Sequence, residues 1–372
     1  MTGIEKISVK KIEELFEKQN TAGAILTPRL YQEKKHIILK YCKDYYNDNQ
    51  TLDNFSYGPS KKVYIEKSNS IFNVFYIRTR KDRNNTKLLI DLGIRKENAL
   101  QYYEYEDPDI DPFYISYIDK ETLNKLPNDV QKVTRKATIF IYKDQNPKGE
   151  LISCNLQSKD GSYQEFNVTA NWAGFQENHF IIFAKVFSKN NSHYVLKQIY
   201  HDDILWWIDD LFSQINSDTY SLFYSPIFAG NSMDTLHLQL IKSNFPVFEK
   251  LNNDYNNYTS ELININDNVW PFPGILARYT VDDKDKILFE LNDKINRYIS
   301  KSGNTFNLLF RTRKEYREVY FAYRKKGKSY IKGISNDIAG FEVGGNLIIE
   351  SKEEFENFSD KVEEIDLVKK SI

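Results

Sequence analysis

A histidine and a glutamine stand two residues apart in the segment AGNSMDTLHLQLIK, residues 229–242, and this pair offers the clearest chemistry in the chain. The segment alternates polar and apolar residues, which predicts a strand with two different faces. The leucines at 236, 238 and 240 would then share the core face. Thr235, His237 and Gln239 would share the other face, so a hydroxyl, an imidazole and an amide would be displayed together.

A loop of small residues, Gly230-Asn231-Ser232, comes shortly before this strand. Backbone N–H groups in such loops form concave sites that bind phosphate. A neutral imidazole beside a phosphate site can attack phosphorus and carry a covalent phosphoryl or nucleotidyl group. The alternative is that His237 is a half-buried strand residue that hydrogen-bonds a neighbour, as single histidines on strands commonly do.

The longer segment FYSPIFAGNSMDTLHLQ, residues 223–239, resembles the active-site signature of the transferase branch of the histidine-triad (HIT) superfamily. That branch includes galactose-1-phosphate uridylyltransferase, diadenosine tetraphosphate phosphorylase and GDP-L-galactose phosphorylase. Its signature runs from an Asn through a Gly/Ser loop to His-x-His-x-Gln. The resemblance implies that His237 is the nucleophile, that Gln239 is the transferase glutamine, and that Ser232 binds phosphate.

Two positions depart from this signature: Thr235 stands where its first histidine is expected, and Ser225 where its asparagine is expected. In the family these residues orient the nucleophile and, in some members, bind metal. The departures favour an alternative, a HIT-like nucleotide-binding or regulatory protein that has lost catalysis. Gln239 argues against simple nucleotide hydrolysis, because an amide cannot act as the acid that the last histidine of the hydrolases supplies.

Other segments between about residues 165 and 350 resemble the same family in the same order. In residues 170–187, His179 stands at a family histidine, and a helical pattern follows at 201–215. Residues 306–349 resemble GDP-galactose phosphorylases and an uncharacterised bacterial HIT-like family. There Glu342 stands where those phosphorylases carry an acid, which implies contact with a ribose or sugar hydroxyl.

The resemblance implies an α+β fold with a HIT-like antiparallel half-barrel sheet and packed helices, and two HIT-like halves as a further expectation. It also implies a nucleotidyltransferase or phosphorylase that acts on a dinucleoside polyphosphate or an NDP-sugar through a nucleotidyl-histidine. The expected partners are that nucleotide and phosphate, with Mg²⁺ accompanying the nucleotide, and a homodimer. The remaining histidines have no cysteines or acids at metal spacing, so no resident metal is expected.

Residues 311–328 hold eight basic residues and two glutamates, a local excess of +6 in a chain of net charge −1. Two interpretations stay open. The charges could lie along solvated strand edges, where they discourage edge pairing, or Arg324 and Lys326 could face one way and bind phosphates. The shared tripeptide Arg-Thr-Arg suggests that segments 62–92 and 305–325 are counterparts in two related halves. A structure that places the two segments in unrelated sheets would exclude this hypothesis.

The bulk composition is that of a globular protein: 372 residues, 28% charged and 41% apolar. A net charge of −1 provides no general attraction to nucleic acid or membrane, so neither is an expected partner. Two cysteines, Cys42 and Cys154, exclude a disulfide framework. No stretch approaches the roughly 18 apolar residues of a membrane span, and the amphipathic N-terminal pattern is not that of a signal peptide. We therefore expect a cytoplasmic protein.

Periodicity and turn residues predict the elements that must position this chemistry. Residues 1–130 are expected to form an N-terminal α/β region of unclear role, with helices over the first ~55 residues, strands over 62–92 and an irregular connection over 103–130. Residues 131–262 would form the HIT-like core with the His-x-Gln motif. Residues 263–372 would form a strand-rich region that completes the nucleotide site, with strands at 274–280, 306–312 and 318–325 and a helix at 284–300.

Overall fold

A computed structural model gives the structure of the protein and describes residues 4–20, 36–37, 40, 60–77, 86–91, 102–105, 109–128, 131, 135–137, 152–171, 178–189, 191–231, 233–255, 259–313, 316–327, 329–365 and 367–369. Of the candidate site residues, Ser232 lies outside these ranges. No helix within them is long and apolar enough to cross a membrane.

A nine-stranded sheet in which all neighbours are antiparallel forms the centre of the fold. Its strands alternate apolar side chains between the two faces, and both faces are covered by other elements over much of the sheet. In spatial order the strands are β13 (Glu261–Ile265), β14 (Gly274–Tyr279), β16 (Tyr316–Lys325), β15 (Asn304–Arg313), β11 (Ser221–Tyr224), β12 (His237–Ile241), β8 (His179–Ala184), β7 (Tyr163–Ala170) and β6 (Ile152–Gln157).

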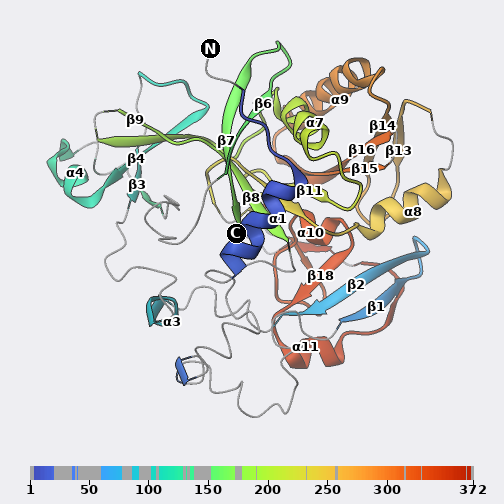
Figure 1. The fold of residues 1–372 in the computed structure, drawn as a ribbon. Coiled ribbons are helices and arrows are strands. Elements are labelled where there is room, and N and C mark those ends of the chain that lie inside the picture. The colour runs from blue at the N-terminus through green and yellow to red at the C-terminus, as the bar shows by residue number, and fades with distance from the viewer. Residues whose placement is uncertain are drawn as a thin grey trace.

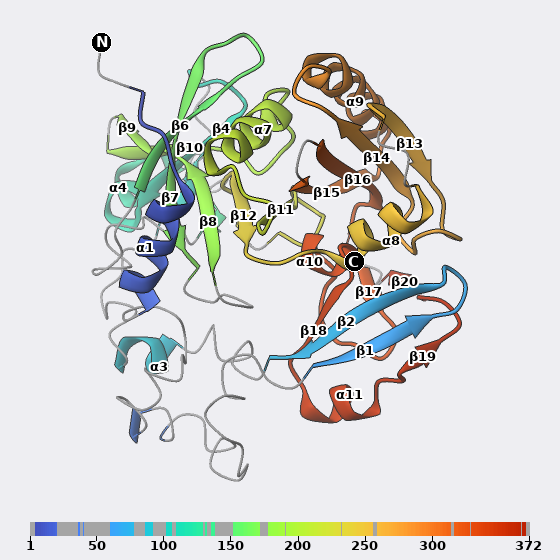
Figure 2. The same cartoon turned by 45° about the vertical axis from the view of Figure 1, so that its right-hand side comes forward.

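Helices α1 (Val9–Asn20), α7 (Ile204–Ile215) and α9 (Lys284–Ile299) pack on one face of this sheet. Figures 1 and 2 show α7 and α9 together on this side, with α8 (Pro246–Asp254) and α10 (Gly340–Val343) on the other. The α7 stripe of apolar residues is fully buried, including Trp206 and Trp207, each 4% exposed. The two tryptophans are therefore core residues.

Three smaller sheets surround the centre. The sheet β18–β2–β1–β19 lies beyond α8 and α10 (Figure 2), and it joins chain segments from near the two ends of the sequence. Its strands are β1 (Ser60–Ile65), β2 (Ser70–Tyr76), β18 (Asn346–Ile349) and β19 (Lys361–Val362). A second sheet contains β5 (Arg135–Ala137), β3 (Tyr102–Tyr105), β4 (Tyr114–Asp119), β10 (Ser192–Leu196) and β9 (Phe187–Lys189), and a third pairs β17 (Ser329–Ile331) with β20 (Leu367–Lys369).

The α+β class is confirmed, while two local predictions are wrong. Residues Thr86–Asp91 form helix α3 rather than the end of a strand series. The segment 103–130 is not an irregular connection, because it contains β3, β4 and helix α4 (Lys120–Lys125). Its acids include a helix cap: the Asp119 carboxylate accepts the backbone N–H of Thr122 at 2.8 Å.

The basic hairpin, residues 311–328, is not the solvated strand edge that was one of the two interpretations of its charge. β16 lies between β14 and β15, so the hairpin is central in the sheet. The carboxylate of Glu318 accepts from Arg278 at 2.9 Å and from Arg311 at 2.7 Å, and all three are at most 5% exposed. A count of charges along the sequence could not show this, because Arg278 lies 40 residues from Glu318.

The two segments that share Arg-Thr-Arg occupy different sheets. β1 and β2 belong to the four-stranded sheet, whereas β15 and β16 belong to the nine-stranded one. The first Arg-Thr-Arg, at 78–80, lies outside the described residues. The tripeptide therefore gives no support to two related halves.

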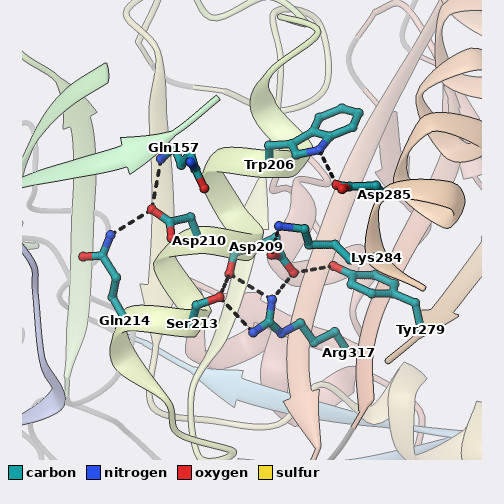
Figure 3. A network of polar contacts seen from close by, with 10 residues as sticks. All are labelled: Gln157, Trp206, Asp209, Asp210, Ser213, Gln214, Tyr279, Lys284, Asp285 and Arg317. Carbon is teal, nitrogen blue, oxygen red and sulfur yellow. Dashed lines mark hydrogen bonds and ion pairs between the residues drawn. The ribbon is translucent and has the colours of Figure 1, made fainter. Parts of the chain in front are cut away.

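A second buried charge cluster attaches α7 to the sheet on the side of α9 (Figure 3). The carboxylate of Asp209 on α7 pairs with the guanidinium of Arg317 on β16 and accepts the Tyr279 hydroxyl at 3.0 Å. Lys284, at the start of α9, places its Nζ 3.6 Å from the same carboxylate. Side chains from four elements, α7, β14, α9 and β16, thus meet at one carboxylate.

Candidate functional site

His237 begins β12, between β11 and β8, and its imidazole lies on the sheet face opposite α7. The three leucines of the motif are at most 1% exposed in the main core, as predicted. The other face is also largely covered: His237 is 2% exposed and Ile241 fully buried, while Gln239 is half-buried. The strand therefore places the polar pair in a protected position rather than on an open surface.

The imidazole of His237 is held in one tautomer by the main chain. Its Nδ1 lies 2.8 Å from the carbonyl oxygen of Thr235. Because a carbonyl oxygen only accepts, Nδ1 carries the hydrogen, and Nε2 then has a lone pair in the neutral ring. No hydrogen-bond partner of Nε2 occurs among the described residues. The threonine side chain at 235 is not needed for this orientation, since the contact is with its backbone.

Burial lowers the pKa of His237, and the hydrogen bond to Thr235 opposes this only in part. Burial penalises the imidazolium, so the ring stays neutral at a pH where a free histidine, with a pKa of about 6.5, is half protonated. We expect ¹⁵N NMR of the five histidines to show His237 as the Nδ1–H tautomer, with a titration below pH 6.5. The spectrum of His237→Asn would assign the resonance. A midpoint at or above the value in unfolded protein would contradict this prediction.

His179 and Gln239 form a second polar pair on the same face. The register sets His179 opposite Ile241, diagonal to Gln239, and His179 Nε2 lies 3.0 Å from Gln239 Oε1. Asn171, at the end of β7, reaches the same ring nitrogen at 3.2 Å. Nε2 cannot donate to Gln239 and accept from Asn171 at the same time, so the tautomer of His179 determines which end of the Gln239 amide faces this ring. His179 is fully buried and thus fixes the glutamine from behind.

Ser225 provides a hydroxyl donor next to His237. The β11–β12 ladder ends at the pair Phe223–Gln239, and beyond it the Gln198 amide bonds the main chains of both Ser225 and His237. The Ser225 Oγ accepts from Asn307 Nδ2 at 2.8 Å and from the Gly340 N–H at 3.1 Å. These two donors occupy the oxygen lone pairs, which leaves the hydroxyl hydrogen to donate. Ser225 is 3% exposed, and no acceptor for that hydrogen occurs among the described residues.

Arg324 contacts Ser225 indirectly, through Asn307, and Glu342 lies near Arg324. Arg324 donates to Asn307 Oδ1 at 2.6 Å, which fixes which end of the Asn307 amide faces Ser225. Its other hydrogen bond goes to the Ile338 carbonyl at 3.2 Å. Burial lowers the Arg324 pKa to about 10, while the nearby Glu342 carboxylate opposes that shift. Glu342 also accepts the backbone N–H of Ala339 at 2.8 Å, so both residues are bound within the protein.

The loop before β12 is held close to the start of α10. Gly230 has a φ of +85°, and a Cβ there would lie 2.5 Å from the Ile338 carbonyl oxygen. Only glycine fits such a backbone at this approach. Asn231, half-buried, donates from Nδ2 to the carbonyl of Met233 at 2.8 Å. Ser232, the predicted phosphate ligand, lies outside the described residues.

Lys326 is separate from Arg324 in the structure. It follows the end of β16, is exposed, and places its Nζ 5.8 Å from the ring centroid of Phe228. The two basic residues thus differ: one is buried in the serine network and the other is at the surface. Within the described ranges, no group of three or more His, Cys, Asp or Glu side chains is arranged to hold a metal ion.

Three residues of this site were missed in the sequence: Asn171, Asn307 and Gln198. Asn307 interrupts an apolar run at 306–310 within β15, and a polar residue in a buried strand is a usable signal. Gln198 gives no such signal, because it follows β10 in an irregular segment. Its contacts with His237 and Ser225 depend on tertiary structure alone.

No family model matches the chain, and no curated protein matches it in sequence. Among solved structures, yeast Ap4A phosphorylase Apa2 in complex with AMP superposes with a TM-score of 0.50 at 13% identity, covering 96% of this chain and 93% of that one. The same enzyme in complex with Ap4A gives a TM-score of 0.50 at 13% identity, over 96% and 94%. The likeness extends over nearly the whole of both chains, so this protein is similar in fold to an Ap4A phosphorylase.

Proposed function

We propose that the protein is a HIT-type nucleotidyltransferase or phosphorylase that works through a nucleotidyl-histidine. One observation carries this proposal: His237 Nδ1 is bound to the Thr235 carbonyl, which leaves Nε2 as a lone-pair nucleophile in a protected position. Beside it lie the unused hydroxyl hydrogen of Ser225 and the amide of Gln239. This is the arrangement that attack on phosphorus requires: a neutral nucleophile with donors for the oxygens.

The proposed reaction has two displacements at the α-phosphorus. Nε2 of His237 forms a bond to phosphorus, and the bond from phosphorus to the leaving phosphate oxygen breaks with its electron pair. In the second step an oxygen of inorganic phosphate or of a sugar phosphate attacks the same phosphorus, and the P–N bond breaks to return the lone pair to Nε2. Splitting the reaction in this way predicts ping-pong kinetics.

The donors on the same face supply the electrostatic part of catalysis. Negative charge moves to the equatorial oxygens of the phosphoryl group, and Ser225 and Gln239 would donate to them. Ser232 and the backbone around Gly230 would add donors from the loop. The departure at Thr235 costs little here, because the carbonyl that orients His237 belongs to the backbone.

Among the possible substrates, a dinucleoside polyphosphate is the first to test, since the fold is similar to that of an enzyme solved with AMP and with Ap4A. For Ap4A the first step would release ATP and leave AMP on His237, and phosphate would then release ADP. The other expectations from the sequence stay predictions. They are the NDP-sugar alternative, Mg²⁺ on the nucleotide, the half-barrel form of the sheet, the domain roles, the homodimer and the cytoplasmic location.

Incubation with α-³²P-labelled nucleotides tests the proposal. The panel contains Ap4A, other dinucleoside tetraphosphates and NDP-sugars, each with and without phosphate. We expect acid-labile label on the protein without phosphate, and its release as a nucleoside diphosphate when phosphate is added. Tight nucleotide binding without label or turnover across the panel would favour the catalytically degenerate, nucleotide-binding alternative.

Ser225→Ala is expected to slow label transfer by about 10²-fold, the usual effect of removing one donor to the transition state. Ser221→Ala is the matched control, because Ser221 is on the same face of β11, is fully buried, and has a hydroxyl that finds no hydrogen-bond partner among the described residues. We expect the control to keep the wild-type rate in single-turnover labelling. Equal rates for the two variants would remove Ser225 from the proposed site.

A further inference from the structure

The β-ladder between β11 and β12 stops just before the proposed nucleophile. It runs through the pairs Ser221–Ile241, Leu222–Leu240 and Phe223–Gln239. Two residues further, where Ser225 and His237 would pair directly, the side chain of Gln198 lies between the two main chains. Gln198 follows β10 and is completely buried.

The Gln198 amide takes over the missing ladder bonds. Its Oε1 accepts the backbone N–H of His237 at 2.6 Å, and its Nε2 donates to the carbonyls of His237 at 3.1 Å and Ser225 at 2.8 Å. These partners fix the amide orientation, because an N–H must meet the oxygen and carbonyls must meet the NH₂ group. Both amide hydrogens and the oxygen are therefore used on the two site strands.

The backbone of Gln198 holds the same two segments. Its N–H donates to the carbonyl of Asp234 at 2.7 Å, and its carbonyl accepts the N–H of Ile227 at 2.8 Å. Gln198 thus bonds the main chain before His237 and the loop after Ser225, next to the hydrogen bond from the Leu236 N–H to the Leu196 carbonyl at 2.6 Å. Two hydrogen bonds in series through an amide also set these strands farther apart than the direct bond of a ladder, whose strands are about 4.8 Å apart.

We infer that Gln198 is a positioning residue that fixes the main chain from Asp234 to His237, and so keeps the His237 Nδ1–H on the Thr235 carbonyl. The inference rests on the proposed function for its catalytic consequence. Its physical basis is that the Thr235–His237 contact joins a side chain to the backbone two residues away. That contact survives only if the intervening main chain keeps its shape, and Gln198 bonds both the N–H and the C=O of His237.

Gln198→Met removes the amide at similar volume and is the first test. We expect ¹⁵N NMR of the ligand-free protein to show loss of the pure Nδ1–H tautomer of His237. Single-turnover labelling should slow by about 10²-fold, as misplacement of a reacting group by about 1 Å does. A folded Met variant with the wild-type tautomer and wild-type labelling rate would overturn the inference.

Gln198→Glu gives a second, pH-dependent test. A carboxylate would keep an acceptor for the His237 N–H but face two carbonyl oxygens without a donor, and burial would raise its pKa. Protonation restores one donor, so labelling by this variant should rise as pH falls, while the wild type, with the lowered His237 pKa, should not show that rise. Parallel pH profiles for the two proteins would count against the inference.

Gln214→Met is the matched control. The Gln214 amide also bridges three groups, accepting from Ile7 N at 2.9 Å and donating to the Asn155 carbonyl at 2.8 Å and to Asp210 at 2.9 Å, but on α7 (Figure 3). It should leave the tautomer and labelling unchanged. If wild type never takes label but Gln198→Met still shifts the tautomer, the proposed function fails and the positioning role stands. If wild type takes label and neither quantity changes, only the positioning role fails.

Discussion

His237→Asn should take no acid-labile label from any α-labelled nucleotide, and turnover should fall by about 10³-fold or more, as removal of a covalent nucleophile does. The reason is the loss of Nε2, the one atom of the ring with an available lone pair. Asparagine is the sharpest choice because its amide N–H can still donate to the Thr235 carbonyl. The substitution therefore removes the nucleophile while it keeps the buried hydrogen bond.

The control for this prediction is a histidine outside the site. His193 lies on β10 and pairs its Nδ1 with the Ser188 hydroxyl at 2.9 Å, so His193→Asn should label like wild type. Mass spectrometry of the labelled protein would locate the adduct. Label that persists in His237→Asn would place the nucleophile elsewhere and end the proposed mechanism, whereas labelling lost in both variants would indicate damage to the fold.

The part of the site that follows from alternation could be predicted from the sequence. A strict period of two around Leu238 separates a core face from a polar face, and the structure has the three leucines in the core. The role of Gly230 is predictable for a similar reason, since a loop of small residues before a strand indicates a backbone conformation that favours glycine. Both signals are local, and local patterns survive in the fold.

The supporting residues could not be predicted, because their partners are set by strand register and by distant segments. Asn307 meets Ser225 from 82 residues away, and Gln198 meets His237 from 39 residues away. In the charged hairpin, by contrast, a residue that the sequence does suggest as a phosphate ligand turns out to be buried. Arg324 belongs to a basic run and so resembles a surface phosphate ligand, yet its position opposite Thr305 in a central strand buries it to 5% exposure.

The largest expected effect on stability is at Asp209, on the sheet face away from His237. Its carboxylate, 1% exposed, pairs with Arg317, accepts the Tyr279 hydroxyl at 3.0 Å and lies 3.6 Å from Lys284 Nζ (Figure 3). Asp209→Ala should lower the free energy of unfolding by about 3–5 kcal/mol, because it leaves a buried guanidinium without its counter-charge. Urea unfolding, compared at constant slope, measures this loss.

Asp210→Ala distinguishes the loss of charge pairing from the loss of an acid on α7. The Asp210 carboxylate accepts from Gln157 N and Gln214 Nε2, both at 2.9 Å, so it makes hydrogen bonds to neutral groups. Its removal should cost about 1.5–3 kcal/mol, the range for hydrogen bonds to a charged group. In Asp209→Ala/Arg317→Met both charges are gone, so the double variant should be more stable than Asp209→Ala alone. If the double variant is instead the less stable one, the unpaired arginine is not the cause, and the Tyr279 and Lys284 contacts must carry the effect.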